Sequence, residues 1–318
     1  MNSLFQKITA ATGLISLLGA AACQNDNLVV PDSPTAIPSQ TVSSDISPNL
    51  SQTVRLIKNG QATLTYYPDG RLKQVTIGAP VRGSLAYSRK YTYDDVNHAI
   101  NATSYSGGKV ILIDVYYLNE KGLCLQSTQV DYTILDKPNP VNIQLNAQWY
   151  YQYNKEGQLE HAHNLFLPGS DRIDYVYDSA GDMIKMTTYD RVAGQDRILI
   201  QTLTLTYTQS PSLRGTAFDD QYPLNASWVR LPVPDESTKG QPVPDQYLPI
   251  FGKPSKHLIV GAVQTQLPGN KLLLNSLFTY RLNPAGYVIE RKELDAHSTS
   301  VLDTKPYAYQ VTAVGVQF

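Results

Sequence analysis

The sequence predicts an all-β protein, a long antiparallel meander of hairpins that forms a strongly curved sheet or a partly closed barrel. Tyrosine-rich segments recur along the chain, and several of them run into an Asn/Asp-x-x-Gly turn before the next segment begins. Tyrosine dominates the aromatic residues, with 22 tyrosines against 6 phenylalanines and 2 tryptophans, which suits sheets that water reaches on one side. No helical periodicity persists beyond the N-terminal segment, so strands are the expected elements.

The turn of the repeat has a local physical basis. Asp or Asn at its first position accepts a hydrogen bond from the backbone two residues on, and Gly at its fourth position supplies the positive φ that closes a type I turn with a bulge. Copies of the repeat occur at 151–159 and 175–183, further turns at 119–122 and 283–286, and a shortened form at 67–70. A degenerate copy at 95–98 has His98 where glycine is expected, and turn chemistry also explains the acidic pair Asp94 and Asp95.

The strands are predicted from aromatic, β-branched and polar residues that alternate between turn signals. They are expected at 53–58, 61–67, 72–77, 87–93, 99–105, 109–118, 123–135, 141–153, 158–166, 172–177, 183–190, 197–208, 257–266, 272–282, 287–294 and 307–318. Asn59-Gly60 and Gly107-Gly108 are tight-turn signals between neighbouring strands. One end of the sheet therefore carries the short Asn/Asp-x-x-Gly turns, and the other end carries varied loops.

Residues 210–256 form a proline-rich insertion in this pattern. Eight prolines lie in the segment, and each removes a backbone donor, which excludes the segment from the centre of a sheet. The insertion contains the aromatic residues Phe218, Tyr222, Trp228, Tyr247 and Phe251. Their apolar surface allows the insertion to pack as a lid or plug over the sheet. The alternative is an excursion that only covers an edge or an open face.

Residues 1–22 have the features of a secretion signal. They carry a single charge, and their apolar stretch is too short to span a bilayer, which takes about 20 residues. Small residues followed by Cys23 resemble a bacterial lipoprotein signal, and the resemblance implies that Cys23 is lipidated. The alternative is an ordinary secretory signal cleaved near Ala22. Residues 23–50, rich in proline and serine, then form a disordered tether to a single β-meander domain at 51–318.

Composition and motifs argue against several functions. The formal net charge is −1 and no basic stripe is present, so nucleic-acid binding has no electrostatic support. The chain has two cysteines, so lipidation of Cys23 leaves Cys124 without a partner, and Cys124 is expected to be a small buried core residue. No Gly-x-Ser-x-Gly elbow, His-Glu-x-x-His helix or phosphate loop occurs, so no catalytic residue and no cofactor are predicted.

Two further pairs of polar residues could take part in metal binding or catalysis. His161 and His163 share a strand face at a spacing found in metal sites, but no third ligand is identifiable. The expectation is therefore solvated or tyrosine-packed histidines, and no metal site is predicted. Asp219 and Asp220, inside the insertion, are the acidic pair that could serve a glycan-active hydrolase.

The tyrosine segments also allow ligand binding. Because alternate residues share a face, Trp149, Tyr151 and Tyr153 lie on one side of their strand, and Tyr175 and Tyr177 lie on one side of theirs. These five rings are a candidate ligand platform that could stack on sugars or hold an extended peptide. The alternative is that this face is the core, and the sequence leaves open which face is exposed.

The last strand allows a different architecture. It ends in Phe318, which resembles the final strand of an outer-membrane barrel. Against that alternative, the charged runs at 88–90 and 290–293 would each place charge in lipid, at a cost of about 2–4 kcal/mol for a cation at the midplane. A lipid anchor would also be redundant on a spanning barrel, so a membrane-inserted barrel is kept only as an alternative.

The Tyr-x-Tyr-Asp/Asn-x-x-Gly units resemble YD-type repeats of bacterial surface proteins. Together with the lipoprotein-like N-terminus, they resemble uncharacterised Bacteroidetes-type lipoproteins that carry a porin-like domain, over most of 51–209 and 271–318. The resemblance implies no catalytic residue. We expect an extracytoplasmic protein, lipid-anchored to the bacterial outer membrane, that binds or scaffolds without catalysis, with a glycan or an envelope protein as partner. The alternatives are a carbohydrate-binding surface lipoprotein and a glycan-active hydrolase.

Overall fold

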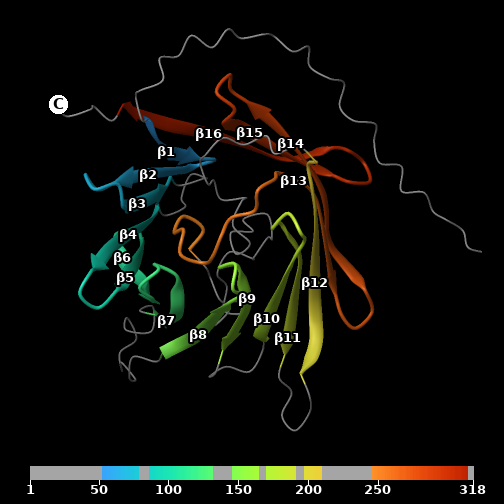
Figure 1. Ribbon diagram of the computed structural model, residues 1–318. Helices are drawn as coiled ribbons and strands as arrows, with labels where there is room; N and C mark the ends of the chain where they lie inside the picture. The colour runs from blue at the N-terminus through green and yellow to red at the C-terminus, as the bar shows by residue number, and fades with distance from the viewer. Residues whose placement is uncertain are drawn as a thin grey trace, which may run out of the picture. The chain divides into compact units, whose positions relative to one another are not determined.

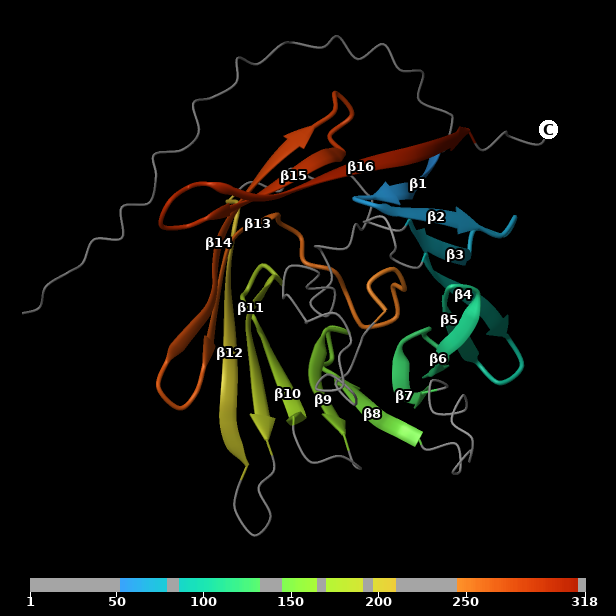
Figure 2. The same cartoon turned by 180° about the vertical axis from the view of Figure 1, so that it is seen from behind.

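The chain folds into a closed antiparallel β-barrel. The computed structural model describes residues 52–78, 86–131, 145–164, 170–190, 197–209 and 245–313. These residues form sixteen strands in which each strand pairs with its neighbours in the sequence, and the last strand pairs with the first (Figures 1 and 2). The predicted all-β meander is therefore confirmed, and the curvature of the sheet is sufficient to close it.

The strands lie close to their predicted positions. They are β1 Gln52–Asn59, β2 Ala62–Tyr66, β3 Leu72–Ile77, β4 Tyr87–Asp94, β5 Ala99–Ser106, β6 Lys109–Leu118, β7 Cys124–Asp131, β8 Leu145–Tyr153, β9 Leu159–Asn164, β10 Ser170–Tyr177, β11 Met183–Asp190, β12 Ile198–Tyr207, β13 Ile259–Gln266, β14 Lys271–Leu282, β15 Val288–Asp295 and β16 Val301–Ala313.

The closing strand β16 differs most from its prediction, since it begins at Val301 rather than at residue 307. Pro306 lies inside it, opposite Glu290 of β15, although proline has no ladder donor. The Pro306 carbonyl instead accepts a hydrogen bond from Gly60 N at 2.8 Å, which keeps the strand attached to the β1–β2 turn. Closure itself comes from the pairing of β1 with β16, from Gln52 opposite Ala313 to Asn59 opposite Tyr307.

The short turns lie together at one end of the barrel, as the sequence predicts. Because the strands alternate in direction, the turns after β2, β4, β6, β8, β10 and β14 share an end, here called the turn end; the turns after β1, β5, β13 and β15 lie at the opposite, loop end. In the turn after β8, Asn154 Oδ1 accepts hydrogen bonds from Glu156 N and Gln158 N at 3.1 and 2.9 Å. Gly157, at φ +80°, donates to Asn154 O, so the expected turn chemistry is confirmed.

The degenerate turn keeps this geometry with one change. His98 has a φ of 50°, the left-handed conformation that glycine holds in the other copies. The accepting carboxylate is Asp94, which bonds Val96 N and Asn97 N. Asp95, which the repeat placed at that position, instead accepts a hydrogen bond from Arg71 Nη1 at 2.6 Å. The aspartate that closes this turn therefore precedes the predicted one.

A first prediction follows from His98. Because a left-handed conformation costs a residue with a Cβ roughly 1–2 kcal/mol, His98→Gly should raise the free energy of unfolding by about 1 kcal/mol. Denaturant unfolding of both proteins measures this. Asn97→Gly, at a position without positive φ, is the control and should not stabilise the protein. A loss of stability in His98→Gly would contradict this account of the turn.

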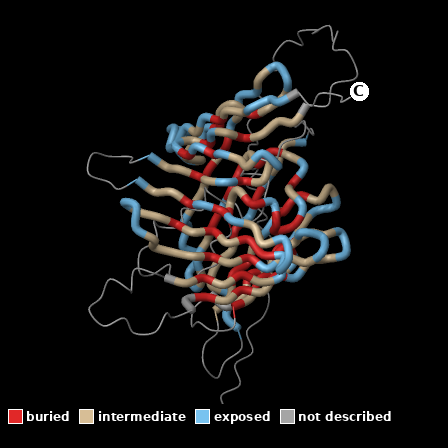
Figure 3. Tube along the Cα trace, turned by 90° about the vertical axis from the view of Figure 1, so that its left-hand side faces the viewer, coloured by how far each residue is buried: buried red, intermediate tan, exposed pale blue. Residues whose placement is uncertain are grey.

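Buried hydrophobic residues line the inside of the barrel. Buried and exposed residues alternate along the strands (Figure 3). On β12, Leu203 and Leu205 are buried and the intervening Thr204 is exposed, while on β4 Tyr91 is buried and Lys90 is exposed. Most inward side chains of these strands are therefore apolar, although Arg89 of β4 is also buried and β12 has exposed apolar residues at Ile198 and Leu199.

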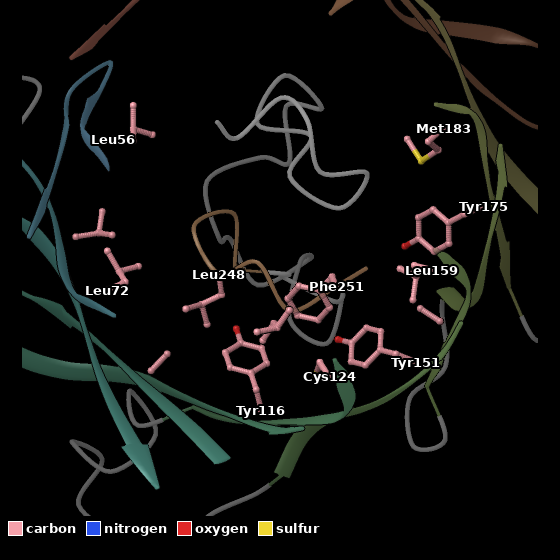
Figure 4. Packing of buried hydrophobic residues seen from close by; sticks show 14 of the residues in the cluster. Leu56, Leu72, Tyr116, Cys124, Tyr151, Leu159, Tyr175, Met183, Leu248 and Phe251 are labelled. Carbon is pink, nitrogen blue, oxygen red and sulfur yellow. The ribbon is translucent and has the colours of Figure 1, made fainter. Parts of the chain in front are cut away.

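A segment between β12 and β13, residues 245–258, lies inside the barrel and is here called the plug (Figure 1). Leu248, Ile250, Phe251 and Leu258 are each 5 % exposed or less and belong to the core cluster. Figure 4 shows Leu248 and Phe251 beside Tyr116 and Tyr151 of the wall. The plug contains residues 245–256 of the predicted insertion, so this part packs into the barrel rather than covering an edge. Residues 210–244 lie outside the described residues.

The repeated tyrosines have a role that the repeat alone does not reveal. At the turn end, six strands carry an inward tyrosine whose hydroxyl donates to a backbone carbonyl of the preceding strand, at 2.6–2.9 Å. These pairs are Tyr66–Leu56, Tyr93–Leu72, Tyr153–Cys124, Tyr207–Met183, Tyr280–Ile259 and Tyr309–Val288. Each of these strand pairs is joined at the loop end, so the hydroxyl bridges the pair where it has no turn. The tyrosines thus close the wall of the barrel at the turn end.

Candidate functional site

A buried ion-pair cluster fixes the plug to the wall. Arg89 of β4 is 8 % exposed, and its Nε donates to Oδ2 of plug residue Asp245 at 2.7 Å. The same guanidinium donates to Ser104 Oγ at 2.8 Å and to the Tyr116 hydroxyl at 2.9 Å. Tyr91 also donates to Asp245 Oδ2, at 2.7 Å. Both partners of this buried charge pair are hydrogen-bonded, as a stable buried pair requires.

A second carboxylate shares the Arg89 charge. Asp114 Oδ2 lies 2.8 Å from Arg89 Nη1 but accepts no aligned hydrogen bond among the described residues, while Asp114 Oδ1 accepts one from Gln129 Nε2. Burial raises the pKa of the Asp114 carboxyl above its ordinary value, and the attraction of Arg89 only partly offsets this. Asp114 is therefore a carboxyl that the fold holds more readily in its protonated form.

This direction of shift predicts a pH dependence of stability. A carboxyl whose pKa is raised in the folded state contributes stability below its unfolded pKa, and the contribution is lost as pH rises through the folded pKa. The free energy of unfolding of the wild type, relative to Asp114→Asn, should therefore fall as pH rises from about 4 to about 8. Chemical denaturation at several pH values measures this difference. A difference that rises with pH would contradict the assigned shift.

A second contact holds the other end of the plug. Asp182, 1 % exposed in the turn before β11, accepts hydrogen bonds from the backbone N–H groups of Lys256 and His257 and pairs with His257 Nδ1. The Tyr207 hydroxyl lies 3.3 Å from Ser255 Oγ. Polar contacts therefore bracket the apolar middle of the plug, and its position is fixed from both sides.

The backbone ladder between β7 and β8 ends before the strands reach the turn end. The ladder between these strands runs to Gln126 opposite Tyr150 and no further. Beyond it, Cys124 N donates to the carbonyl of plug residue Ile250 at 2.8 Å, and the Tyr153 hydroxyl lies 2.7 Å from Cys124 O and 3.2 Å from Ile250 O. Beyond the ladder the two strands are therefore joined by the Tyr153 side chain, and the plug supplies part of the missing backbone pairing.

A cleft of about 730 Å³ lies at this end of the ladder and is here called the seam cleft. Its volume is within the range of about 300–1,000 Å³ that is usual for small-molecule sites. The cleft is lined by the turns after β6 and β8, by Leu123 and Leu125, and by Gln152 and Glu160. Tyr151 and Tyr153 also line it. The cleft thus reaches from exposed residues to rings of the inner face, and it is our candidate functional site.

The structure places the five rings of the candidate ligand platform on the inner face. Trp149, Tyr151 and Tyr175 are 1–4 % exposed, and Tyr153 and Tyr177 are half-buried. Tyr151 packs edge-on against Phe251 of the plug at 5.0 Å between centroids, and its hydroxyl lies 2.8 Å from Ser127 Oγ. The five rings therefore do not form an open outer surface. Tyr151 and Tyr153 can meet a ligand through the seam cleft, and ligand binding by the platform stays a prediction.

The other singled-out residues have structural contacts or lie outside the described part of the chain. His161 Nδ1 lies 2.8 Å from Asp174 Oδ1, and the His163 ring stacks on Tyr150 at 5.4 Å. Among the described residues, no group of three His, Cys, Asp or Glu side chains could hold a metal, and no helix is long and apolar enough to cross a bilayer. Cys124 is fully buried as expected, and burial raises the pKa of its thiol. Cys23, Asp219 and Asp220 lie outside the described residues.

Sequence reasoning missed the Arg89 cluster. The charged runs at 88–90 and 290–293 argue against a membrane-inserted barrel because they would place charge in lipid, but Arg89, Arg291 and Glu293 in these runs are 3–8 % exposed and point inward. The alternation of side chains in β4 could have indicated the inward position of Arg89, because Arg89 shares its strand face with Tyr91 and Tyr93. No sequence pattern indicates that Asp245 is its partner, since Asp245 lies 156 positions away in the insertion.

Comparison with known proteins gives similarities in structure only. No protein-family model matches the chain, and no curated protein is significantly similar to it. Among solved structures, it is similar to a porin-like protein from Bacteroides uniformis, with 17 % identity and a TM-score of 0.46 over 84 % of this chain and 93 % of that one. A porin-like protein from Bacteroides vulgatus gives 13 % identity and a TM-score of 0.49 over 80 % and 98 %.

A third structure, of TcdB2-TccC3 without its hypervariable C-terminal region, has 12 % identity and a TM-score of 0.24, over 79 % of this chain and 14 % of that one. Similarities at these TM-scores do not support a function. The chain thus resembles Bacteroides porin-like proteins in structure, and its assignment to lipoproteins with YD-like repeats stays a prediction.

Proposed function

We propose that this protein is a non-catalytic binding or scaffolding protein of the bacterial cell envelope, anchored to the outer membrane by a lipid on Cys23. The observation that carries the proposal is the plug. Leu248, Ile250 and Phe251 pack against the inner wall, and Arg89 holds the plug there through Asp245. A plug that is hydrogen-bonded to β4, to β7 and to the turn before β11 obstructs the interior and so favours contacts on the outer wall over transport through the barrel.

The seam cleft is a candidate surface for a ligand. It combines exposed polar side chains, such as Gln152 and Glu160, with the apolar Leu123 and Leu125. The turns that frame it are closed by their own hydrogen bonds, so the site is formed before a ligand arrives. A preformed polar and apolar cleft supports the carbohydrate-binding alternative as the second candidate function.

The binding role is tested with the full-length protein, purified in detergent and mixed with fragments of its own cell envelope. Saturable binding is expected, and Gln152→Ala together with Lys121→Ala in the cleft should weaken it several-fold. Gln310→Ala together with Lys185→Ala, at exposed positions of β16 and β11, is the matched control and should leave binding unchanged. Envelope binding that is absent, or that the cleft variants leave intact, would overturn the assignment of the cleft.

The anchor has a separate test. Cys23→Ser should move the protein from the membrane fraction to the soluble fraction of cells that express it, because the lipid-bearing thiol is removed. Unchanged fractionation would refute lipidation at Cys23 and would leave the binding role to be judged by the cleft variants.

A further inference from the structure

The charges around the seam cleft are balanced. Glu120 and Lys121 lie in the turn after β6, Lys155 lies in the turn after β8, and Glu160 lies on β9. Two cations and two carboxylates therefore line the cleft. Lys155 Nζ also lies 3.6 Å from Glu156 Oε1, outside the lining. A site for a strongly charged ligand needs an excess of the opposite charge, so the cleft selects for a ligand without net charge.

The mixture of side chains fits a ligand whose groups both donate and accept hydrogen bonds. Lysine only donates and an ionised carboxylate only accepts, while the Gln152 amide does both. Sugar hydroxyls have the same dual character, so a chain of hydroxyls can satisfy neighbouring donors and acceptors in the cleft. Leu123, Leu125 and the ring of Tyr153 supply the apolar surface on which the C–H face of a sugar ring packs.

The strand edge at the cleft is already occupied, which argues against an added peptide strand. A peptide that extends a sheet needs free backbone groups on the edge strand. At Cys124, the N–H donates to Ile250 O and the carbonyl accepts from the Tyr153 hydroxyl. The plug and a wall tyrosine thus already fill the positions that a bound strand would use.

We propose that the seam cleft is a binding site for a neutral oligosaccharide. The inference rests on the proposed binding function and assigns its ligand class. The sugar ring packs on Tyr153, Leu123 and Leu125, and its hydroxyls bond to Gln152, Lys121 and the neighbouring carboxylates. The volume of the cleft, about 730 Å³, accommodates a short oligosaccharide rather than a single small ion.

The test is a titration of the full-length protein in detergent by calorimetry, up to millimolar ligand. The probes are maltotetraose, mannotetraose and galactotetraose, with tetragalacturonate as the acidic probe and tetra-alanine as the peptide probe. At least one neutral tetrasaccharide should bind saturably and more tightly than both of the other probes. Gln152→Ala and Lys121→Ala should each weaken that binding about tenfold, which corresponds to about 1.4 kcal/mol. Gln310→Ala and Lys185→Ala should leave it unchanged.

Three results would overturn the ligand class: no saturable binding of any neutral tetrasaccharide, tighter binding of the acidic or peptide probe, or sugar binding that the cleft variants do not weaken. The envelope-binding experiment separates this failure from failure of the proposed function. Envelope binding that is lost in the cleft variants, while no sugar binds, would keep the binding role and reject the oligosaccharide. Thermal unfolding of each variant confirms that the exposed substitutions leave the fold intact.

Discussion

Arg89→Met should lower the free energy of unfolding by about 3–5 kcal/mol, because it leaves two buried carboxylates without their cation. Asp114 and Asp245 have side chains 5 % and 2 % exposed, and each lies within 2.8 Å of the guanidinium. Methionine fills much of the same volume, so the loss reports the charge rather than a cavity. Burial also raises the pKa of the Tyr91 and Tyr116 hydroxyls, which keeps both protonated as donors toward the cluster.

Urea unfolding measures this loss, and Arg281→Met is the matched control. The Arg281 side chain is 63 % exposed and lies 3.4 Å from Glu290, so its loss should cost less than about 1 kcal/mol. Adding Asp114→Asn and Asp245→Asn to the Arg89 variant should restore part of its stability, since the unpaired charges are then removed. Equal effects of the two methionine substitutions would show that the buried cluster does not hold the plug.

Phe251→Ala should destabilise the barrel by about 3–5 kcal/mol, the usual cost of removing a buried aromatic side chain. Phe251 is 1 % exposed and contacts the rings of Tyr116 and Tyr151 edge-on, with centroids 5.8 and 5.0 Å apart. Edge-on pairs contribute about 0.5–1.5 kcal/mol each beyond the area they bury. Phe251→Leu, which retains most of the volume, should lose less.

The Cys124 thiol reports whether the plug itself loosens in this variant. Cys124 is fully buried and its N–H bonds to Ile250 O, so the plug covers it in the wild type. Alkylation of the thiol under native conditions should be slow in the wild type and faster in Phe251→Ala. Leu125→Ala is the control, because Leu125 is 48 % exposed and its truncation should change stability by about 0.5 kcal/mol or less. Wild-type rates in Phe251→Ala would contradict packing of the plug by this ring.

The strands could be predicted because their signals are local. Residues 72–77 and 109–118 were predicted with the bounds that β3 and β6 have, since turn residues mark both ends of each strand. The same holds for the turns, where one Asx side chain and one positive φ decide the geometry. His98 shows that the conformation persists even where the expected glycine is replaced.

Side-chain partners far apart in the sequence could not be predicted in this way. The alternation of side chains along β8 places Trp149 and Tyr151 on the same face of the strand. Whether that face is the inner or the outer one depends on closure of the sheet. The seam cleft depends on where the β7–β8 ladder ends and on the carbonyl of Ile250, which is supplied by the plug. No local sequence pattern predicts the end of this ladder or the contact with the Ile250 carbonyl.

An antiparallel all-β meander with its short turns at one end follows from the sequence alone, because hydrogen bonds within a few residues fix each turn and alternation fixes each strand. Only closure of the sheet sets the pairing of β1 with β16, the inward position of tyrosines such as Tyr151 and Tyr175, and the contact of Arg89 with Asp245 inside the barrel. The physical reason is that burial and ion pairing depend on which surfaces meet after the sheet closes. Those contacts join residues up to hundreds of positions apart, such as Gln52 and Ala313.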